Sequence, residues 1–298
     1  REGRVIRVIE RMAKDIVGTL KSTGRFYYVV PLDPRYQSDF YVSDNAGGEI
    51  GDRVIVRFLD WENKHVNPEG EIVEVLGPAD DPSVDTLSVL HQFDLPREFP
   101  RETLDEAELA ANYMSEPGER LDLREKTIFT IDPKRARDFD DALSLEQDDQ
   151  GRRVLGVHIA DVSHFVRPGS ALDKEARKRA NSVYMPDQVL PMLPEQLSNG
   201  VCSLRPDEDR LAFSVFLTFD EKGVPVRRAF ARSVIRSRAR LTYPQAMAAM
   251  APRIKQSQDK AGSRRGADEN NPQPPVPRRI VDLMVGIHKL ARQMRRKR

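Results

Sequence analysis

Four aspartates crowd into one short stretch of this chain, where their side chains can act together. Asp132, Asp138, Asp140 and Asp141 fall within ten positions, directly after a strand-like run at 127–131. Carboxylates this close repel one another at neutral pH unless a cation neutralises them. Mg²⁺ does so, and it binds through one or two carboxylates together with substrate phosphate. The spacing therefore fits a magnesium site that acts on a phosphate-containing substrate.

Other interpretations of the acidic cluster remain. A short acidic run is usually a solvated turn. A calcium-binding loop needs glycine at its sixth position and glutamate at its twelfth, but counting from Asp138 those positions hold Leu143 and Asp149. A phosphatase of the aspartyl-phosphate type places its aspartates at the end of a buried apolar strand, whereas basic residues precede them here. These basic residues, Arg137 among them, favour ionised carboxylates and suit a polyanionic substrate.

The local backbone decides whether the carboxylates meet. In an extended strand, Asp138 and Asp140 would project to one side and Asp141 to the other. A loop or bulge would instead gather them, and Asp132 would reach the same point if the loop after it folds back.

Three stretches in order along the chain resemble the RNB exoribonucleases, the family of ribonuclease II and ribonuclease R. DPKRARDFDDA at 132–142 resembles the family's metal-binding signature, and HIADVSHFV at 158–166 resembles its second block. SVYMP, LPMLP and LSNGVCSL, which lie between 182 and 204, are similar to the third block. Three ordered blocks are much harder to match by chance than a single acidic motif.

The resemblance implies a processive exoribonuclease that hydrolyses RNA from its 3′ end to nucleoside 5′-monophosphates. It implies Mg²⁺ as the cofactor, with Mn²⁺ able to substitute, and single-stranded RNA or RNA with a 3′ overhang as the partner. One ion would activate the attacking water and a second would stabilise the leaving oxygen. We expect a monomeric, cytoplasmic enzyme without a membrane association.

Site residues follow from the matched blocks. The resemblance makes the four aspartates both the catalytic residues and the metal ligands. It places Tyr184 against the 3′ end of the RNA, and Tyr243 in the RNA channel. Arg137, inside the first block, is assigned to RNA binding.

The predicted fold class is α+β, in which a small antiparallel OB-type β-barrel resembling a cold-shock domain precedes the first half of a mixed α/β catalytic domain. Short strands with turn residues between them are typical of an OB barrel, which binds single-stranded nucleic acid on aromatic side chains. Alternation places Phe26 and Tyr28 on one face and Tyr27 on the other, so one set must fill the core. The strand-like runs lie at 5–9, 16–20, 26–30, 40–42, 54–58 and 71–75.

We expect the barrel domain at 1–77, a connector at 78–120 and the N-terminal part of the RNB domain at 121–298. The family's catalytic domain continues into a second half that supplies an arginine and a glutamate, so the chain is expected to be a segment. The patterns in 78–298 predict helices from Thr103, over 172–180, near 237–243 and from Ile280, hairpins at 142–159 and 211–234, and a disordered insertion at 252–277.

Composition is that of a folded, highly charged protein. Of the 298 residues, 39% are hydrophobic and 32% are charged. No run approaches the roughly eighteen apolar residues of a membrane helix, and no secretory signal is visible. The single cysteine, Cys202, lies in an apolar run and is expected to be a buried hydrophobe, which fits a reducing compartment.

Three other polar residues have plain structural interpretations. His158 and His164 are expected to be satisfied core or cap histidines rather than ligands. Asp161 fits either a turn or cap role, or a role in orienting the site.

The charge is unevenly distributed along the chain. Residues 224–298 carry 19 Lys and Arg against four acidic residues, a local net charge of +15 in a chain whose net charge is +1. A basic half suggests a phosphate-rich partner, although a solvated surface would look the same. The alternative to a nuclease is therefore a non-catalytic RNA-binding protein that uses the β-barrel and this basic half.

Overall fold

The structure is a computed structural model that describes residues 15–61, 65–112, 119–256 and 276–296. The chain divides into two compact units. Unit 1 contains Arg1–Glu98 and Val183–Leu190, and unit 2 contains Phe99–Ser182 and Pro191–Arg298. The strand expected at 5–9 lies outside the described residues, and the domain limits at 77 and 120 remain predictions.

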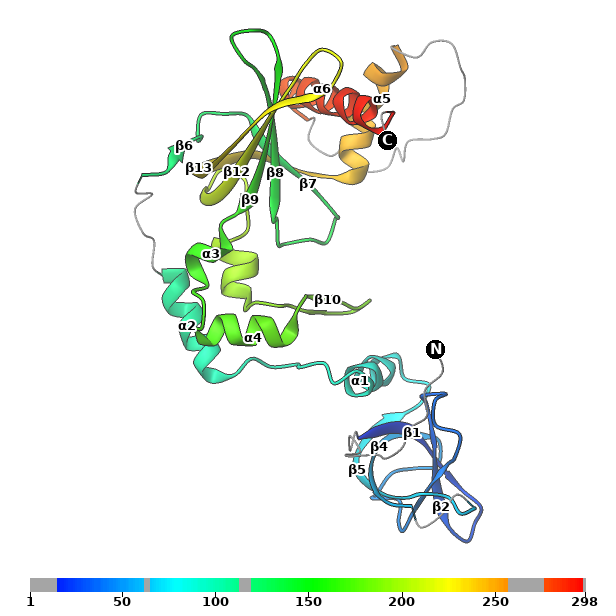
Figure 1. Ribbon diagram of the computed structural model, residues 1–298. Helices are drawn as coiled ribbons and strands as arrows, with labels where there is room; N and C mark the ends of the chain where they lie inside the picture. Colours follow the sequence, from blue (N-terminus) through cyan, green and yellow to red (C-terminus); the bar gives the residue numbers. More distant parts are fainter. Residues whose placement is uncertain (1–14, 62–64, 113–118, 257–275, 297–298) are drawn as a thin grey trace, which may run out of the picture. The chain divides into compact units, whose positions relative to one another are not determined.

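Unit 1 is a closed five-stranded barrel, in the strand order β1-β2-β3-β5-β4 (Figure 1). Its small apolar side chains Leu20, Val29 and Val54 are completely or almost completely buried. This confirms the predicted OB-type barrel, with the one addition that β3 and β5 pair in parallel. The strands are β1 (Ile16–Ser22), β2 (Tyr27–Pro31), β3 (Phe40–Val42), β4 (Asp52–Asp60) and β5 (Glu69–Pro78).

The two faces of β2 separate as the alternation predicted. Tyr27 packs against the barrel core. Phe26 lies outside with its ring centroid 6.5 Å from that of Tyr28 and 5.9 Å from that of Tyr41. Unit 1 also contains the helix α1 (Pro82–Gln92), which is capped at its N-terminus by Asp81, and a short hairpin of β10 (Val183–Tyr184) and β11 (Val189–Leu190).

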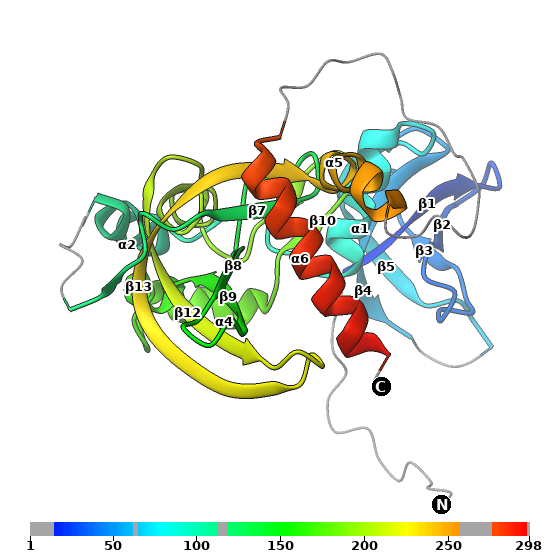
Figure 2. The same cartoon turned by 90° about the horizontal axis from the view of Figure 1, so that it is seen from above.

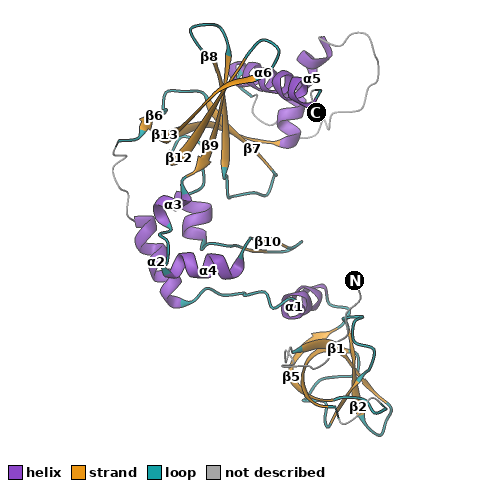
Figure 3. Cartoon of the chain, in the orientation of Figure 1, coloured by secondary structure: helices purple, strands orange, loops and turns teal. Residues whose placement is uncertain are grey.

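Unit 2 is built on a six-stranded mixed sheet in the order β12-β9-β8-β7-β13-β6 (Figure 3). The strand β13 is 18 residues long. It pairs with β12 over its first part and in parallel with β7 over its last part, so the sheet curls back on itself. The strands are β6 (Leu121–Asp122), β7 (Ile128–Asp132), β8 (Asp141–Gln147), β9 (Arg153–Ala160), β12 (Asp209–Phe219) and β13 (Pro225–Thr242).

The helices α5 and α6 pack against this sheet. The two helices lie next to each other in unit 2 (Figure 2). Residues of these helices such as Met284 form one core cluster with Phe129 and Leu241 of the sheet. The approach is close at Gly286, where a Cβ would lie 2.6 Å from the end of the Leu145 side chain. The helices of unit 2 are α2 (Arg101–Asn112), α3 (Val162–Phe165), α4 (Ala171–Arg179), the π-helical turn Gln196–Val201, α5 (Tyr243–Gln256) and α6 (Arg278–Arg295).

Two predicted boundaries were wrong. Residues 237–242, expected to open a helix, continue β13, because they pair with β7 and only then does α5 begin at Tyr243. The predicted start of the insertion, at Pro252, was too early in the chain, because α5 runs through Pro252 to Gln256. Packing of Ile254 on α6 and an ion pair between Arg253 and Asp282 hold this last turn despite the proline.

A chain of polar side chains crosses the interior of the curled sheet. The ring of His158 lies 3.0 Å from Ser144 Oγ and 2.7 Å from Ser214 Oγ, and Ser214 Oγ lies 2.6 Å from Ser233 Oγ. All four residues are almost completely buried. Burial, helped by the charge of Lys126, lowers the pKa of His158 from its ordinary 6.5 to about 4. His158 is therefore the satisfied core histidine that the sequence predicted.

This burial predicts a pH dependence of stability. The neutral imidazole stabilises the fold fully above pH 6.5, and the contribution is lost as the pH falls from 6.5 towards 4. In His158→Gln we expect a lower free energy of unfolding at pH 7, but a decline between pH 7 and 5 that is shallower by about 2 kcal/mol. Urea unfolding followed by circular dichroism measures both. His65→Gln, on an exposed residue, should keep the parental slope, and an unchanged slope in His158→Gln would contradict the assignment.

Candidate active site

The four aspartates lie on the loop between two neighbouring strands of unit 2 and on the strand residues at its two ends. Asp132 is the last residue of β7 and is only 7% exposed, whereas Asp141 opens β8 and is exposed. Asp138 and Asp140 lie in the loop that joins the two strands. Of the two backbone conformations considered from the sequence, an extended strand and a loop, the structure therefore has the loop. Because β7 and β8 are antiparallel neighbours, the loop begins and ends at the same end of these two strands.

Backbone contacts fix the acidic loop, residues 133–140, from two sides. The hydroxyl of Ser203 donates to the carbonyl oxygen of Arg137 at 2.7 Å and accepts from the backbone N–H of Phe139 at 3.1 Å. The N–H of Leu204 donates to the carbonyl oxygen of Phe139 at 2.9 Å, and the N–H of Ala160 donates to that of Asp140 at 2.9 Å. The second and third sequence blocks thus hold the first.

Arg240 closes the loop on a third side. Its guanidinium donates to the carbonyl oxygens of Pro133 at 2.6 Å and Lys134 at 3.0 Å, and it lies 5.3 Å from the centroid of the Phe139 ring. Arg240 reaches this position because β13 runs parallel to β7, with Thr242 opposite Asp132. The start of the loop is therefore tied to β13, the strand that ends directly before Tyr243.

The aspartates form one electrostatic group. Partial burial raises the pKa of Asp140, and the charges of Asp138, Asp141 and Asp132 raise it further. Burial also raises the pKa of Asp132. The hydroxyl of Thr130, which donates to its Oδ2 at 2.5 Å, and the charge of Arg240 oppose that rise, while Asp141 and Asp138 add to it. The four side chains thus lie within each other's electric field and repel.

This arrangement fits a divalent cation bound together with a substrate. Among the residues that the structure describes, no three His, Cys, Asp or Glu side chains gather closely enough as they stand to hold a metal ion. Mg²⁺ does not require such a set, because it keeps several waters and binds through one or two carboxylates and the phosphates of its substrate. The repulsion among the four carboxylates is the charge that a cation there would balance.

The three predicted RNA-binding residues are placed differently. Tyr243 is 56% exposed and follows directly after Thr242, the residue paired with Asp132. Arg137 is exposed on the acidic loop, and its backbone carbonyl oxygen accepts a hydrogen bond from Ser203. Tyr184 is 64% exposed on the β10–β11 hairpin, which belongs to unit 1, whereas the aspartates belong to unit 2.

Asp161, which the sequence left between a cap role and an orienting role, lies in a buried ion pair. Arg120 donates to its Oδ2 at 2.7 Å, and both side chains are less than a tenth exposed. Burial alone would raise the pKa of Asp161, but hydrogen bonds from Ser163 and Arg120 outweigh it and hold the pKa below its usual range. Because Asp161 follows Ala160, which binds the acidic loop, this pair anchors the loop's support.

Cys202 is buried, as the sequence predicted. Burial raises the pKa of its thiol to about 12, so it remains protonated and unreactive at neutral pH.

Sequence reasoning missed three residues that position the site, namely Thr130, Ser203 and Arg240. Ser203 was visible only as part of the third sequence block, with no polar neighbour in the chain to suggest its partners. Arg240 was assigned to the start of a helix, which hid its pairing with β7. Only the tertiary contacts give these residues their roles.

The comparisons with known proteins place both units. Residues 120–298 match the RNB domain and residues 28–100 match the cold shock domain. The chain belongs to the RNB family, whose members include exoribonucleases, and this confirms the resemblance drawn from the three sequence blocks.

Individual relatives agree with this family. Ribonuclease R of Thermotoga maritima is 47% identical over 247 residues, which cover 81% of this chain and 35% of that protein. The chain therefore spans about a third of the length of this curated relative. A structure of Mycoplasma genitalium RNase R in complex with double-stranded RNA is similar with a TM-score of 0.75 and 25% identity, over 99% of this chain and 49% of that one. Yeast Ssd1, a pseudonuclease, shares the fold with a TM-score of 0.66 and 19% identity, over 98% of this chain and 35% of that one.

The hydrogen bonds of Ser203 give a prediction for the acidic loop. Ser203→Ala leaves the N–H of Phe139 and the carbonyl of Arg137 without their partner, which should cost about 1–3 kcal/mol. Amide hydrogen exchange at Phe139 should become at least about tenfold faster. Ser182→Ala is the matched control, since its hydroxyl accepts from the N–H of Met192 away from the loop. Equal exchange at Phe139 in the parent and in Ser203→Ala would show that Ser203 does not hold the loop.

Proposed function

We propose that this chain is the part of a 3′-to-5′ exoribonuclease that holds the carboxylates of its active site. The substrate is single-stranded RNA or the 3′ overhang of a duplex, and the products are nucleoside 5′-monophosphates released processively. Its family membership and its relatives among the ribonucleases R support this proposal. The observation that carries it is the mutual repulsion of Asp132, Asp138, Asp140 and Asp141 on a loop fixed by three separate strands or turns.

In this proposal the four aspartates bind Mg²⁺, with Mn²⁺ as a substitute. The bound cation would supply an activated water and would balance the negative charge that develops at the scissile phosphate. The chain's own residues orient these carboxylates. Thr130 fixes one oxygen of Asp132, and Ala160 and Ser203 fix the backbone on both sides of Asp138 and Asp140.

RNA contacts come from residues beside the carboxylates. Tyr243, exposed one residue beyond the partner of Asp132, can stack on a base close to the scissile phosphate. Arg137 can pair with a backbone phosphate from the acidic loop. Tyr184 is proposed to stack on a base near the 3′ end, by analogy with the family block that contains it.

A non-catalytic RNA-binding protein is the competing function. The fold itself does not exclude it, because the pseudonuclease Ssd1 shares this fold. The intact acidic loop favours hydrolysis, since a protein that only grips RNA gains nothing from four repelling carboxylates beside a polyanion.

The decisive variant is Asp140→Asn in the enzyme that carries this chain. It removes one charge and nearly no volume, so RNA affinity should stay within about twofold while turnover falls by roughly a hundredfold or more, because even the partners of metal ligands are worth 10–100-fold. Release of labelled nucleoside 5′-monophosphates measures turnover, and fluorescence anisotropy with EDTA measures affinity. Asp149→Asn, in the exposed β8–β9 turn, is the matched control and should behave as the parent.

A metal titration separates the two functions. Hydrolysis should need Mg²⁺ or Mn²⁺ and stop with EDTA, whereas a pure RNA binder shows only the salt dependence of phosphate contacts. Undiminished turnover in Asp140→Asn would rule out this role for the aspartates.

A further inference from the structure

One row of side chains crosses the sheet of unit 2 from the acidic loop to β13. The strand register places Asp141 opposite Ile159, Ile159 opposite Phe213, and Phe213 opposite Arg232. Residues directly opposite each other in antiparallel strands point to the same face of a sheet. Arg232 and the candidate metal ligand Asp141 therefore lie on one face, with Ile159 and Phe213 between them.

This face exposes aromatic surface next to the row. Phe230, two residues before Arg232 on β13, lies on the same face, with its ring centroid 6.5 Å from that of Phe213 and the two rings tilted by 32°. Phe230 is 63% exposed, Phe213 41% and Ile159 42%. The opposite face of the same strands is buried, where Ser214 and His158 lie. The helix α6 covers the part of the outer face around Leu145 but leaves these three side chains open.

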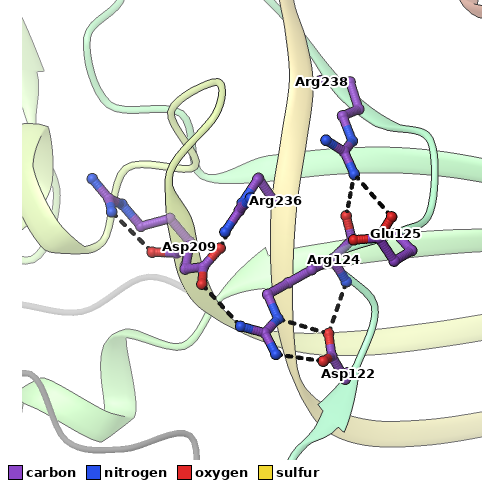
Figure 4. Close-up of polar contacts among 7 residues, drawn as sticks. Asp122, Arg124, Glu125, Asp209, Arg236 and Arg238 are labelled. Atoms are coloured by element: carbon purple, nitrogen blue, oxygen red, sulfur yellow. Dashed lines mark hydrogen bonds and ion pairs between the residues drawn. The ribbon is translucent and has the colours of Figure 1, made fainter.

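The arginines of β13 divide into two groups. In the second half of the strand, Arg236 binds Asp209 at 2.7 Å and Arg238 binds the carbonyl oxygen of Arg124 at 2.6 Å (Figure 4). In the first half, Arg228 and Arg232 are exposed on the same face as Phe213 and Phe230. Among the described residues, neither guanidinium has a hydrogen-bond or ion-pair partner, although the charge of Arg232 helps to lower the pKa of the buried Asp161. Their guanidinium groups thus keep their donors for a partner.

We propose that Ile159, Phe213, Phe230, Arg228 and Arg232 form an aromatic–arginine surface that binds the single-stranded RNA leading to the aspartates. Bases stack on Phe213 and Phe230, and Arg228 and Arg232 pair with the phosphates that flank them. Exposed rings next to unpaired cations match a polyanion with flat bases, and the row that ends at Asp141 connects this surface to the acidic loop. The inference rests on the proposed function, since it assigns the path of that function's substrate.

RNA affinity of two double variants tests the surface. Phe213→Ala with Phe230→Ala should weaken binding of a fluorescein-labelled twelve-nucleotide oligoadenylate by at least about tenfold, from the stacking of two bases. Arg228→Gln with Arg232→Gln should lower the slope of log affinity against log salt by about 1.4, which is two phosphate contacts on a single strand. Anisotropy in EDTA measures both without hydrolysis, so the result does not depend on the aspartates.

Matched controls lie outside the surface. Phe93→Ala removes a ring that is 62% exposed in unit 1, and Arg177→Gln removes an exposed arginine on α4 that pairs with Asp173. Both should bind the oligonucleotide like the parent. Circular dichroism should show all variants folded, because the substituted side chains are largely exposed.

Several results would overturn the proposal. Parental affinity and salt slope in both double variants would do so, as would an absence of oligoadenylate binding by the parent chain. A change in sedimentation of the phenylalanine variant, with RNA affinity unchanged, would show that the face is covered by another protein surface instead. Failure of the proposed function is a separate result, because it appears as turnover retained in Asp140→Asn.

Discussion

Repulsion among four carboxylates is the constraint around which unit 2 is built. Left free, a loop with these charges would open towards solvent, where water screens them. Ser203, Ala160 and Arg240 prevent this by holding backbone atoms of the loop, and none of them neutralises a carboxylate by a direct hydrogen bond. The carboxylates are thus kept near one another, where a cation would balance their mutual repulsion.

The long strand β13 brings the supports together. Its pairing with β12 and then with β7 closes the sheet and aligns Thr242 with Asp132. The curl leaves little room inside, and the interior is accordingly lined with small residues around His158. A Cβ at Gly156 would lie 2.3 Å from Ser144 Oγ and 2.8 Å from His158 Nε2. The polar chain through His158 is therefore a consequence of the same closure that places Arg240 over the acidic loop.

The sequence predicted the parts of this structure that local pattern determines. The barrel strands within the described residues, the two hairpins and α6 follow from alternation or from a helical period over several residues, and each appears where it was expected, whereas the strand predicted at 5–9 lies outside those residues. The aspartates were found because their crowding is local in the sequence. Boundaries set by tertiary partners were missed. Residues 237–242 are polar and basic enough to open a helix, and only pairing with β7 makes them a strand, while Pro252 looks like a break until Ile254 packs on α6. Ser203 and Arg240 carry no local signal, because their partners are backbone carbonyls and an amide far away in the chain.

The excess of basic residues after Val224 shows what composition can and cannot predict about a charged surface. Sequence alone showed a net charge of +15 and could not separate a nucleic-acid surface from a solvated one. The structure shows that the two interpretations apply to different residues of one strand. Arg236, Arg238 and Arg240 bind carboxylates and carbonyl oxygens of their own fold, so their charge stabilises β13. Arg228 and Arg232 bind no carboxylate or carbonyl oxygen among the described residues, although the charge of Arg232 acts on the buried Asp161, and both arginines share a face with Asp141. An arginine that already pairs with a carboxylate would have to break that pair before it could bind phosphate, which costs free energy. A guanidinium group without such a pair gains hydrogen bonds when it binds phosphate. The proposed RNA path therefore uses the first half of the strand and follows the sheet towards the carboxylates.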